Sequence, residues 1–156
     1  MTKTGSKLVL GALLAAVTAC GGPETSSDQG AAAGGSAAAQ AVFTGSLIVS
    51  TTSTTVGTPF TVTETATNLT SSQVGPIIIG IRRLGLNVVS AQKPRTGICR
   101  IAGSATCNFV ELAPNETQSY TLTLTASAPG TYTIQGWTTS SYVTGGFSGS
   151  ASVTVE

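Results

Sequence analysis

The chain has 156 residues, which is enough for one domain of ordinary size and little more. Charged residues make up only 8% of it, against roughly a quarter in an ordinary soluble domain. Its surface must therefore be covered mostly by the hydroxyl groups of Ser and Thr. Seven basic and six acidic residues nearly cancel, so the sequence lacks the basic patch of a nucleic-acid-binding protein.

The first twenty residues follow the order of an export signal. Lys3 and Lys7 form a positively charged region, residues 8–17 form an apolar region, and small residues follow. The segment Val17-Thr18-Ala19-Cys20 resembles the lipobox of bacterial lipoproteins. In that family the signal peptide, here residues 1–19, is cleaved before the Cys, whose sulfur carries a diacylglycerol. The alternative is an ordinary secretory signal with an incidental Cys.

This resemblance implies a protein held on a membrane through lipid on Cys20. Gly21 follows it, whereas similar Gram-negative lipoproteins of the inner membrane carry Asp there, so the outer membrane or cell surface is favoured. Residues 20–42 contain almost no large apolar side chain, which predicts a flexible Gly/Ala/Ser linker. No apolar run approaches the ~20 residues of a spanning helix, so we expect no transmembrane segment after processing.

From residue 43 to residue 156 the pattern changes, and apolar and hydroxyl-bearing side chains alternate. This period of two is typical of strands with one buried face, and turn signals recur about every ten residues. We expect an all-β, Ig-like antiparallel two-sheet β-sandwich of seven to nine short strands. The residues predicted to face inward include Phe60, Val62, Glu64 and Ala66; Tyr120, Leu122 and Leu124; and Phe147, Gly149, Ala151, Val153 and Val155.

Four segments combine turn and strand signals, namely residues 56–63 (VGTPFTVT), 96–108, 111–117 (ELAPNET) and 128–133 (APGTYT). Together they resemble the conserved-repeat domain of bacterial surface proteins (domain of unknown function eleven), over nearly all of residues 45–156. The resemblance implies an Ig-like spacer or adhesion module without enzymatic activity. In that family the domain is usually repeated in tandem, whereas this chain has one copy.

Three cysteines in an exported chain are explained by one lipidated residue and one pair. Cys99 and Cys107 lie symmetrically about Gly103 and share the strand parity of Phe109, so they can face each other across a tight hairpin. An oxidising compartment favours a disulfide between them. The chain has no His, one Met and no third thiol nearby, so we expect neither a metal site nor a cofactor.

The same absences argue against catalysis. Without His, the usual triads and general bases are missing, and Asp28 is the only Asp. Glu111 and Glu116 could in principle serve a two-carboxylate glycosidase. They flank an Ala-Pro-Asn turn, however, where solvated charge is usual. We therefore expect no enzyme and keep a small envelope hydrolase only as an alternative.

The five basic residues of the domain lie within nineteen positions. They either meet an anionic partner, such as lipid head groups, acidic polysaccharide or an acidic protein surface, or they are simply solvated. Glu64 falls among inward-facing residues and therefore needs a partner, for which Arg82 or Arg83 is plausible. The basic residues are Arg82, Arg83, Lys93, Arg95 and Arg100.

Trp137 belongs to the outer face of its strand if Tyr132 and Ile134 point inward. There it would form, with Tyr142, an aromatic platform for a sugar or a partner strand. A bulge at Gly136 would instead turn the indole into the core. The sequence leaves core packing and a binding role both open.

These features favour a non-enzymatic, lipid-anchored envelope or cell-surface module that acts in adhesion, scaffolding or binding. The expected contacts are the membrane, through the lipid on Cys20, and an envelope protein or polysaccharide. The alternative is an accessory subunit of a surface complex that pairs with another Ig-like domain.

Cys20→Ser tests the anchor. Without the sulfur the lipid has no attachment point, so the protein should move from the detergent phase to the aqueous phase in a phase-partitioning assay. Unchanged partitioning of the variant would remove the lipoprotein hypothesis.

Overall fold

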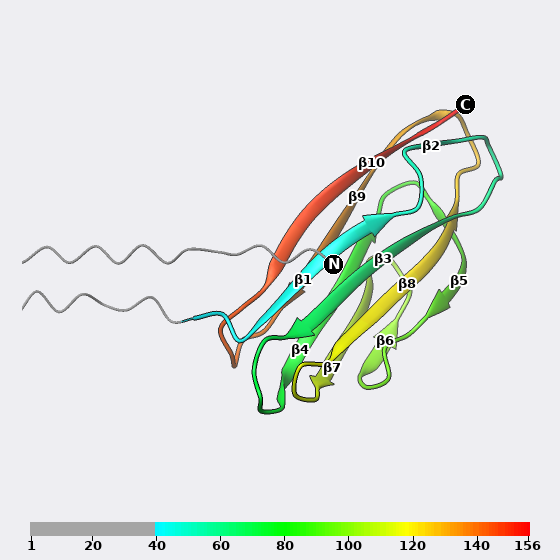
Figure 1. The fold of residues 1–156 in the computed structure, drawn as a ribbon. Helices are drawn as coiled ribbons and strands as arrows, with labels where there is room; N and C mark the ends of the chain where they lie inside the picture. The colour runs from blue at the N-terminus through cyan, green and yellow to red at the C-terminus, as the bar shows by residue number, and fades with distance from the viewer. Residues whose placement is uncertain (1–39) are drawn as a thin grey trace, which may run out of the picture. The chain divides into compact units, whose positions relative to one another are not determined.

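Ten β-strands build the part of the chain that the computed structural model describes, residues 40–156 (Figure 1). They form two sheets packed face to face, which confirms the all-β, Ig-like sandwich. The strand number exceeds the expected seven to nine because the two-residue β2 is included. The signal peptide, Cys20 and residues 20–39 of the expected linker lie outside the described residues. Within residues 40–156 no helix is long and apolar enough to cross a membrane.

The two sheets differ in size. The four-stranded sheet has the order β1 (Phe43–Val49), β3 (Phe60–Asn68), β8 (Thr117–Thr125) and β5 (Asn87–Gln92). The six-stranded sheet has the order β2 (Ser53–Thr54), β10 (Phe147–Val155), β9 (Gly130–Thr139), β4 (Val74–Arg83), β7 (Ala105–Leu112) and β6 (Ile98–Arg100).

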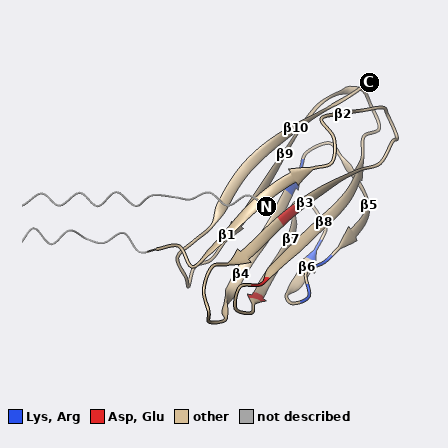
Figure 2. Cartoon of the chain, viewed as in Figure 1, with Lys and Arg blue, Asp and Glu red and all other residues tan. Residues whose placement is uncertain are grey.

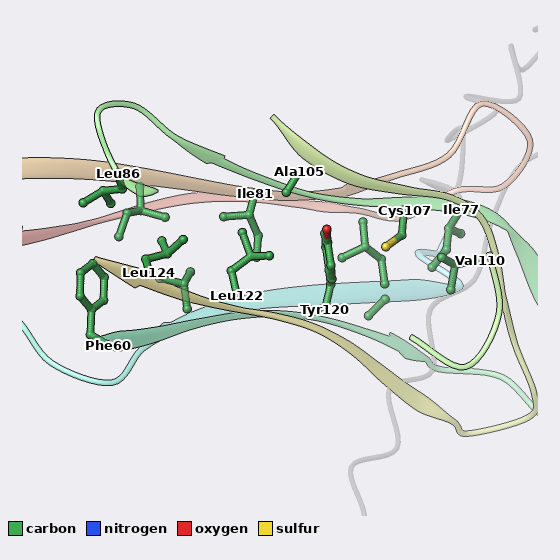
Figure 3. Packing of buried hydrophobic residues seen from close by; sticks show 14 of the residues in the cluster. Phe60, Ile77, Ile81, Leu86, Ala105, Cys107, Val110, Tyr120, Leu122 and Leu124 are labelled. Atoms are coloured by element: carbon green, nitrogen blue, oxygen red, sulfur yellow. The ribbon is translucent and has the colours of Figure 1, made fainter. Parts of the chain in front are cut away.

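The core is one layer of apolar side chains between the sheets, and Figure 3 shows part of it as a row. It forms because every second residue of β3, β8 and β9 points inward, as the alternation of the sequence predicts, whereas the pairing of β4 with β7 contains irregularities. In β3 and β8 these inward residues are fully or almost fully buried. In β10 the inward residues become buried only at Val153 and Val155, and the first part of that strand is half-exposed. The largest wholly buried side chains are Tyr120, Phe43, Ile77, Ile79, Ile81, Leu112, Leu122, Leu124 and Ile134.

Asn68 fixes the turn that follows β3. Its side-chain amide donates to the carbonyl oxygens of Ser72, Leu112 and Ala113, at 2.7, 3.2 and 2.8 Å. Its side-chain oxygen accepts from both the backbone N–H and the hydroxyl of Thr70. Asn68 is 1% exposed, so the segment Asn68-Leu69-Thr70 serves as a structural turn in this fold.

Glu64 is a fully buried carboxylate in the middle of β3. The Thr138 hydroxyl, on the opposite sheet, donates to its Oε1 at 2.9 Å. Its Oε2 is buried without a hydrogen-bond partner and lies against Gly136, where a Cβ atom would overlap it. Because burial removes water from the charged form, the pKa of Glu64 rises from 4.5 to about 7, although the bond from Thr138 acts in the opposite direction.

The predicted partnership of Glu64 with Arg82 or Arg83 is wrong. Arg82 is exposed and points outward from the six-stranded sheet. Arg83 instead donates to the carbonyl oxygens of Leu86 and Ile101, at 2.8 and 2.9 Å. The register explains the difference, because Gly136 of β9 pairs with the apolar Ile81 of β4 and the arginines come later in that strand.

Glu64 predicts a dependence of stability on pH. A carboxyl whose folded pKa exceeds its unfolded pKa stabilises the fold fully at low pH, and that contribution is lost as the pH rises from about 4.5 to about 7. We expect the free energy of unfolding to fall by about 2–3 kcal/mol over this range. Glu64→Gln keeps an acceptor for Thr138 and cannot ionise, so it should remove this decrease in urea titrations at several pH values.

The Glu64 effect is distinguishable from other carboxylates. The pKa of Glu116 is lowered, first by a hydrogen bond from the backbone of Ala113 and then by one from Arg95. Its contribution to stability is therefore lost on acidification, at lower pH and with the opposite sign. A Glu64→Gln variant that keeps the same decrease between pH 4.5 and 7 would contradict the assignment.

Candidate binding face

The outer face of the six-stranded sheet carries polar side chains and one indole ring. Ser148, Trp137, Gly80 and Thr106 are direct neighbours on β10, β9, β4 and β7, and Arg100 continues the row on β6. Since an antiparallel ladder places paired residues on the same face, these side chains form one line across the sheet. No bulge interrupts β9 at Gly136, so Trp137 lies on the outer face.

Trp137 is half-buried because its ring lies across Gly80 of the neighbouring strand. A Cβ atom built on Gly80 would overlap Cε2 and Cζ2 of the indole, and Gly80 is itself buried beneath it. The missing side chain therefore makes the space in which the ring rests on the sheet. This contact fixes the indole without taking it into the core.

A hollow of about 540 Å³ opens beside the indole. Arg82 and Gln135, paired between β4 and β9, border it. Gly136 and Gly149 pair with each other beside it, so the hollow reaches down to their backbone. All the residues that line this hollow, hereafter the Trp137 hollow, are Arg82, Ser104, Gln135, Gly136, Trp137, Ser148, Gly149 and Ser150.

The structure disperses the basic cluster expected from sequence. Arg82 lines the Trp137 hollow, and Arg100 is exposed on the same face at the edge strand β6. Arg95 forms an ion pair with Glu116 at 2.9 Å, whereas Lys93 is exposed just after β5. Figure 2 shows how few charged positions the domain carries.

Arg83 belongs to the edge of the core. Its guanidinium holds two backbone carbonyls, and its charge lowers the pKa of Tyr120 while burial, the larger effect, raises it. Its Nε is buried without a partner. Only Arg82 and Arg100 of the five basic residues therefore share the outer face with Trp137.

Tyr142 does not join Trp137 in one platform. It is 76% exposed and lies beyond the end of β9, where it lines a second hollow of about 300 Å³. Phe109, which is 61% exposed, borders the same hollow. The sequence alone does not mark Phe109 as a surface aromatic, because Phe109 has the same strand parity as the buried Cys107.

A β-bulge explains the exposure of Phe109. Ile77 pairs with Val110 and Ile79 pairs with Cys107, so two residues of β7 oppose the single Ile78 of β4. Phe109 has φ 58°, a left-handed conformation that bulky residues rarely adopt. The extra residue breaks the two-residue alternation, and the sequence contains no glycine or proline within Ala105–Leu112 to signal it.

The predicted disulfide between Cys99 and Cys107 is confirmed. The two residues pair across β6 and β7, and their sulfurs are bonded. The bond holds the edge strand β6, of only three residues, against β7. Arg100 is the next residue, so the disulfide also fixes the edge of the outer face.

The two candidate catalytic carboxylates lie on either side of the turn between β7 and β8, with Glu111 near the end of β7 and Glu116 just before β8, and both take part in local hydrogen bonding. Glu116 accepts from the backbone N–H of Ala113 at 2.7 Å in addition to its ion pair. Glu111 is exposed and accepts from Gln73 at 3.0 Å. Within residues 40–156 no group of three or more His, Cys, Asp and Glu side chains is placed to hold a metal ion.

Comparison with known proteins gives a likeness of fold. No family model matches the chain, and no curated protein matches it. The solution structure of a CARDB domain from Pyrococcus furiosus is 17% identical, with a TM-score of 0.51, covering 73% of this chain and 94% of that one. This likeness supports a β-sandwich fold alone.

Two further solved structures match less closely. A crystal structure of the Pyrococcus furiosus CARDB domain with di-metal ions is 16% identical, with a TM-score of 0.47, covering 72% of this chain and 91% of that one. The cupredoxin domain of AmoB from Nitrosocaldus yellowstonii is 15% identical, with a TM-score of 0.45, covering 70% and 83%.

Gly80→Ala tests the seating of the indole. The added methyl overlaps the ring, so the ring must move toward solvent, and the variant should lose about 1–3 kcal/mol of stability. Trp137 is the only Trp of the chain, so its fluorescence reports the movement as a red shift. The control is Thr133→Ala, at an exposed outward position of β9, the strand of Trp137, and it should leave the spectrum unchanged. An unshifted spectrum for Gly80→Ala would contradict the contact.

Proposed function

We propose that this protein is a non-enzymatic envelope module, anchored through Cys20, that binds an anionic glycan on the outer face of its six-stranded sheet. The observation that carries the proposal is the Trp137 hollow. There an indole, a guanidinium, a carboxamide and several hydroxyls border one concave surface. The Cys99–Cys107 disulfide supports an exported, oxidising location.

The chemistry of the hollow suits a sugar. A pyranose ring offers an apolar face of C–H groups and a rim of hydroxyls. The indole provides a rigid surface for the apolar face, and Gln135, Ser148 and Ser150 provide donors and acceptors for the rim. A site that orients its ligand with a few polar groups around an aromatic surface is typical of small-molecule recognition.

The charge of the hollow favours an anionic ligand. Arg82 is exposed, and the one ion pair within residues 40–156 joins Arg95 to Glu116 instead. A guanidinium binds carboxylate or sulfate groups in a planar, bidentate way that a neutral sugar cannot match. Arg100, on the same face, adds to the positive potential.

A second candidate is an accessory subunit that pairs with another Ig-like domain. The edge strands β5 and β6 carry exposed apolar side chains, with Val89 at 59% and Ile98 at 62% exposure. Exposed edges of this kind can accept a further strand. This candidate predicts a stable protein complex that survives loss of the Trp137 ring.

A glycan array that contains uronic-acid, sialic-acid, sulfated and neutral oligosaccharides tests the main proposal with the full-length protein. We expect binding to anionic members only. Trp137→Ala should weaken it about tenfold or more, and Arg82→Gln should remove the preference for charge. Lys93→Gln removes the same charge far from the hollow and should have no effect.

Each variant must first be shown to be folded by its circular dichroism and cooperative unfolding. Absence of glycan binding, or binding that is unchanged by folded Trp137→Ala, would overturn the proposal. Turnover of any glycan would overturn its non-enzymatic part.

A further inference from the structure

Phe109 and Tyr142 are two large aromatic side chains left in solvent at one place. Phe109 comes from the bulge in β7, and Tyr142 comes from the loop between β9 and β10. Together they border a hollow of about 300 Å³, hereafter the Tyr142 hollow. Two separate elements thus bring exposed apolar area to one hollow. Such a concentration of exposed apolar area indicates contact with another molecule.

Both aromatics are held in place by the fold. Ser140 donates its hydroxyl to the carbonyl oxygen of Pro76 at 2.8 Å and accepts from the backbone N–H groups of Tyr142 and Val143. These bonds fix the start of the loop over β4. On the other side, pairing of Ile77 and Ile79 with β7 holds the bulge on both flanks. The left-handed backbone of Phe109 is unfavourable for this residue type, and such conformations persist where the surrounding structure imposes them, often at binding sites.

The Tyr142 hollow and the Trp137 hollow lie along the same strands of the six-stranded sheet and share no lining residue. On β4, Ile78 lines the Tyr142 hollow and Arg82 lines the Trp137 hollow. These two residues are four positions apart in one strand, which corresponds to about 13 Å. The outer face therefore presents two aromatic hollows in sequence along β4 and β9.

The two hollows differ in charge. Arg82 lines the first, while no charged residue lines the second. Beside the aromatics, the polar residues of the second hollow are Asn108, Ser140 and Ser141. A ligand that fills both must offer an anionic group at one position and an uncharged, ring-like group a short distance along. A chain of linked sugar rings has this form, whereas a single sugar occupies one hollow only.

We infer that the ligand is an oligosaccharide chain and that the Tyr142 hollow is a second subsite for it. This inference rests on the proposed function and extends it from a class of sugar to a polymer. Linking two sugar contacts through one chain makes the second contact intramolecular, so affinity rises with chain length until both hollows are filled.

Titration calorimetry with the full-length protein tests the inference. The probes are hyaluronan, heparin-derived and oligogalacturonate oligosaccharides of two, four and six residues. In a series that binds, the wild type should bind the hexasaccharide at least about tenfold more tightly than the disaccharide. Tyr142→Ala should abolish most of this gain and leave disaccharide affinity unchanged. Val89→Ala truncates an exposed apolar residue of the other sheet and should change neither affinity.

The outcomes separate the two proposals. Binding that is independent of length, or an equal loss of disaccharide affinity in Tyr142→Ala, would overturn the second subsite and leave the Trp137 hollow standing. Failure of all three series to bind would overturn the second subsite, and the same failure together with a glycan array that shows no binding would overturn both proposals. Sedimentation velocity tests whether the protein self-associates through the Tyr142 hollow. If the wild type self-associates and Tyr142→Ala does not, this hollow is a contact between two copies of the chain and the second subsite is overturned.

Discussion

One layer of apolar side chains must hold this sandwich together, because charged side chains are too few to add much. The inward residues of β3, β4, β7 and β8 form most of that layer, and the single ion pair within residues 40–156 is exposed at Arg95. Each strand has only two faces, and one of them packs into the core. The side chains on the outer faces are therefore not needed for core packing. The outer face of the six-stranded sheet is consequently where a ring, a guanidinium and a hollow occur together.

The sequence predicted the parts of the fold that follow from strict alternation. Tyr120, Leu122 and Leu124 face inward because nothing interrupts the period of β8. The same rule pointed Trp137 outward but left a bulge at Gly136 open as the alternative. The contact that seats the indole is made with Gly80, a residue 57 positions earlier in the chain. Pairing between distant strands determines such contacts, and one strand's period carries no information about its neighbour.

The structure departs from the sequence-based expectations where alternation breaks or where a partner lies on another sheet. Phe109 follows the parity of Cys107 in sequence, but the bulge turns it outward. Glu64 was expected to meet an arginine, yet the register places Ile81 on β4 at that level and leaves the carboxylate with Thr138. Neither the outward position of Phe109 nor the partner of Glu64 can be predicted from the neighbouring residues in the sequence. Both depend on how strands that are distant in the sequence align in the folded protein.

One small residue, Gly136, contacts the core on the inner side of its sheet and lines the Trp137 hollow on the outer side. At Gly136 the missing side chain leaves room for the buried carboxyl of Glu64 on the inner side, while the same residue lines the Trp137 hollow on the outer side. Ala at this position would overlap Glu64 and Leu47 within the core. The glycines that weaken strand propensity on β9 and β10 are accounted for by the groups that they admit, since a Cβ atom at Gly136 would overlap the carboxyl of Glu64 and one at Gly149 would overlap the ring of Phe147.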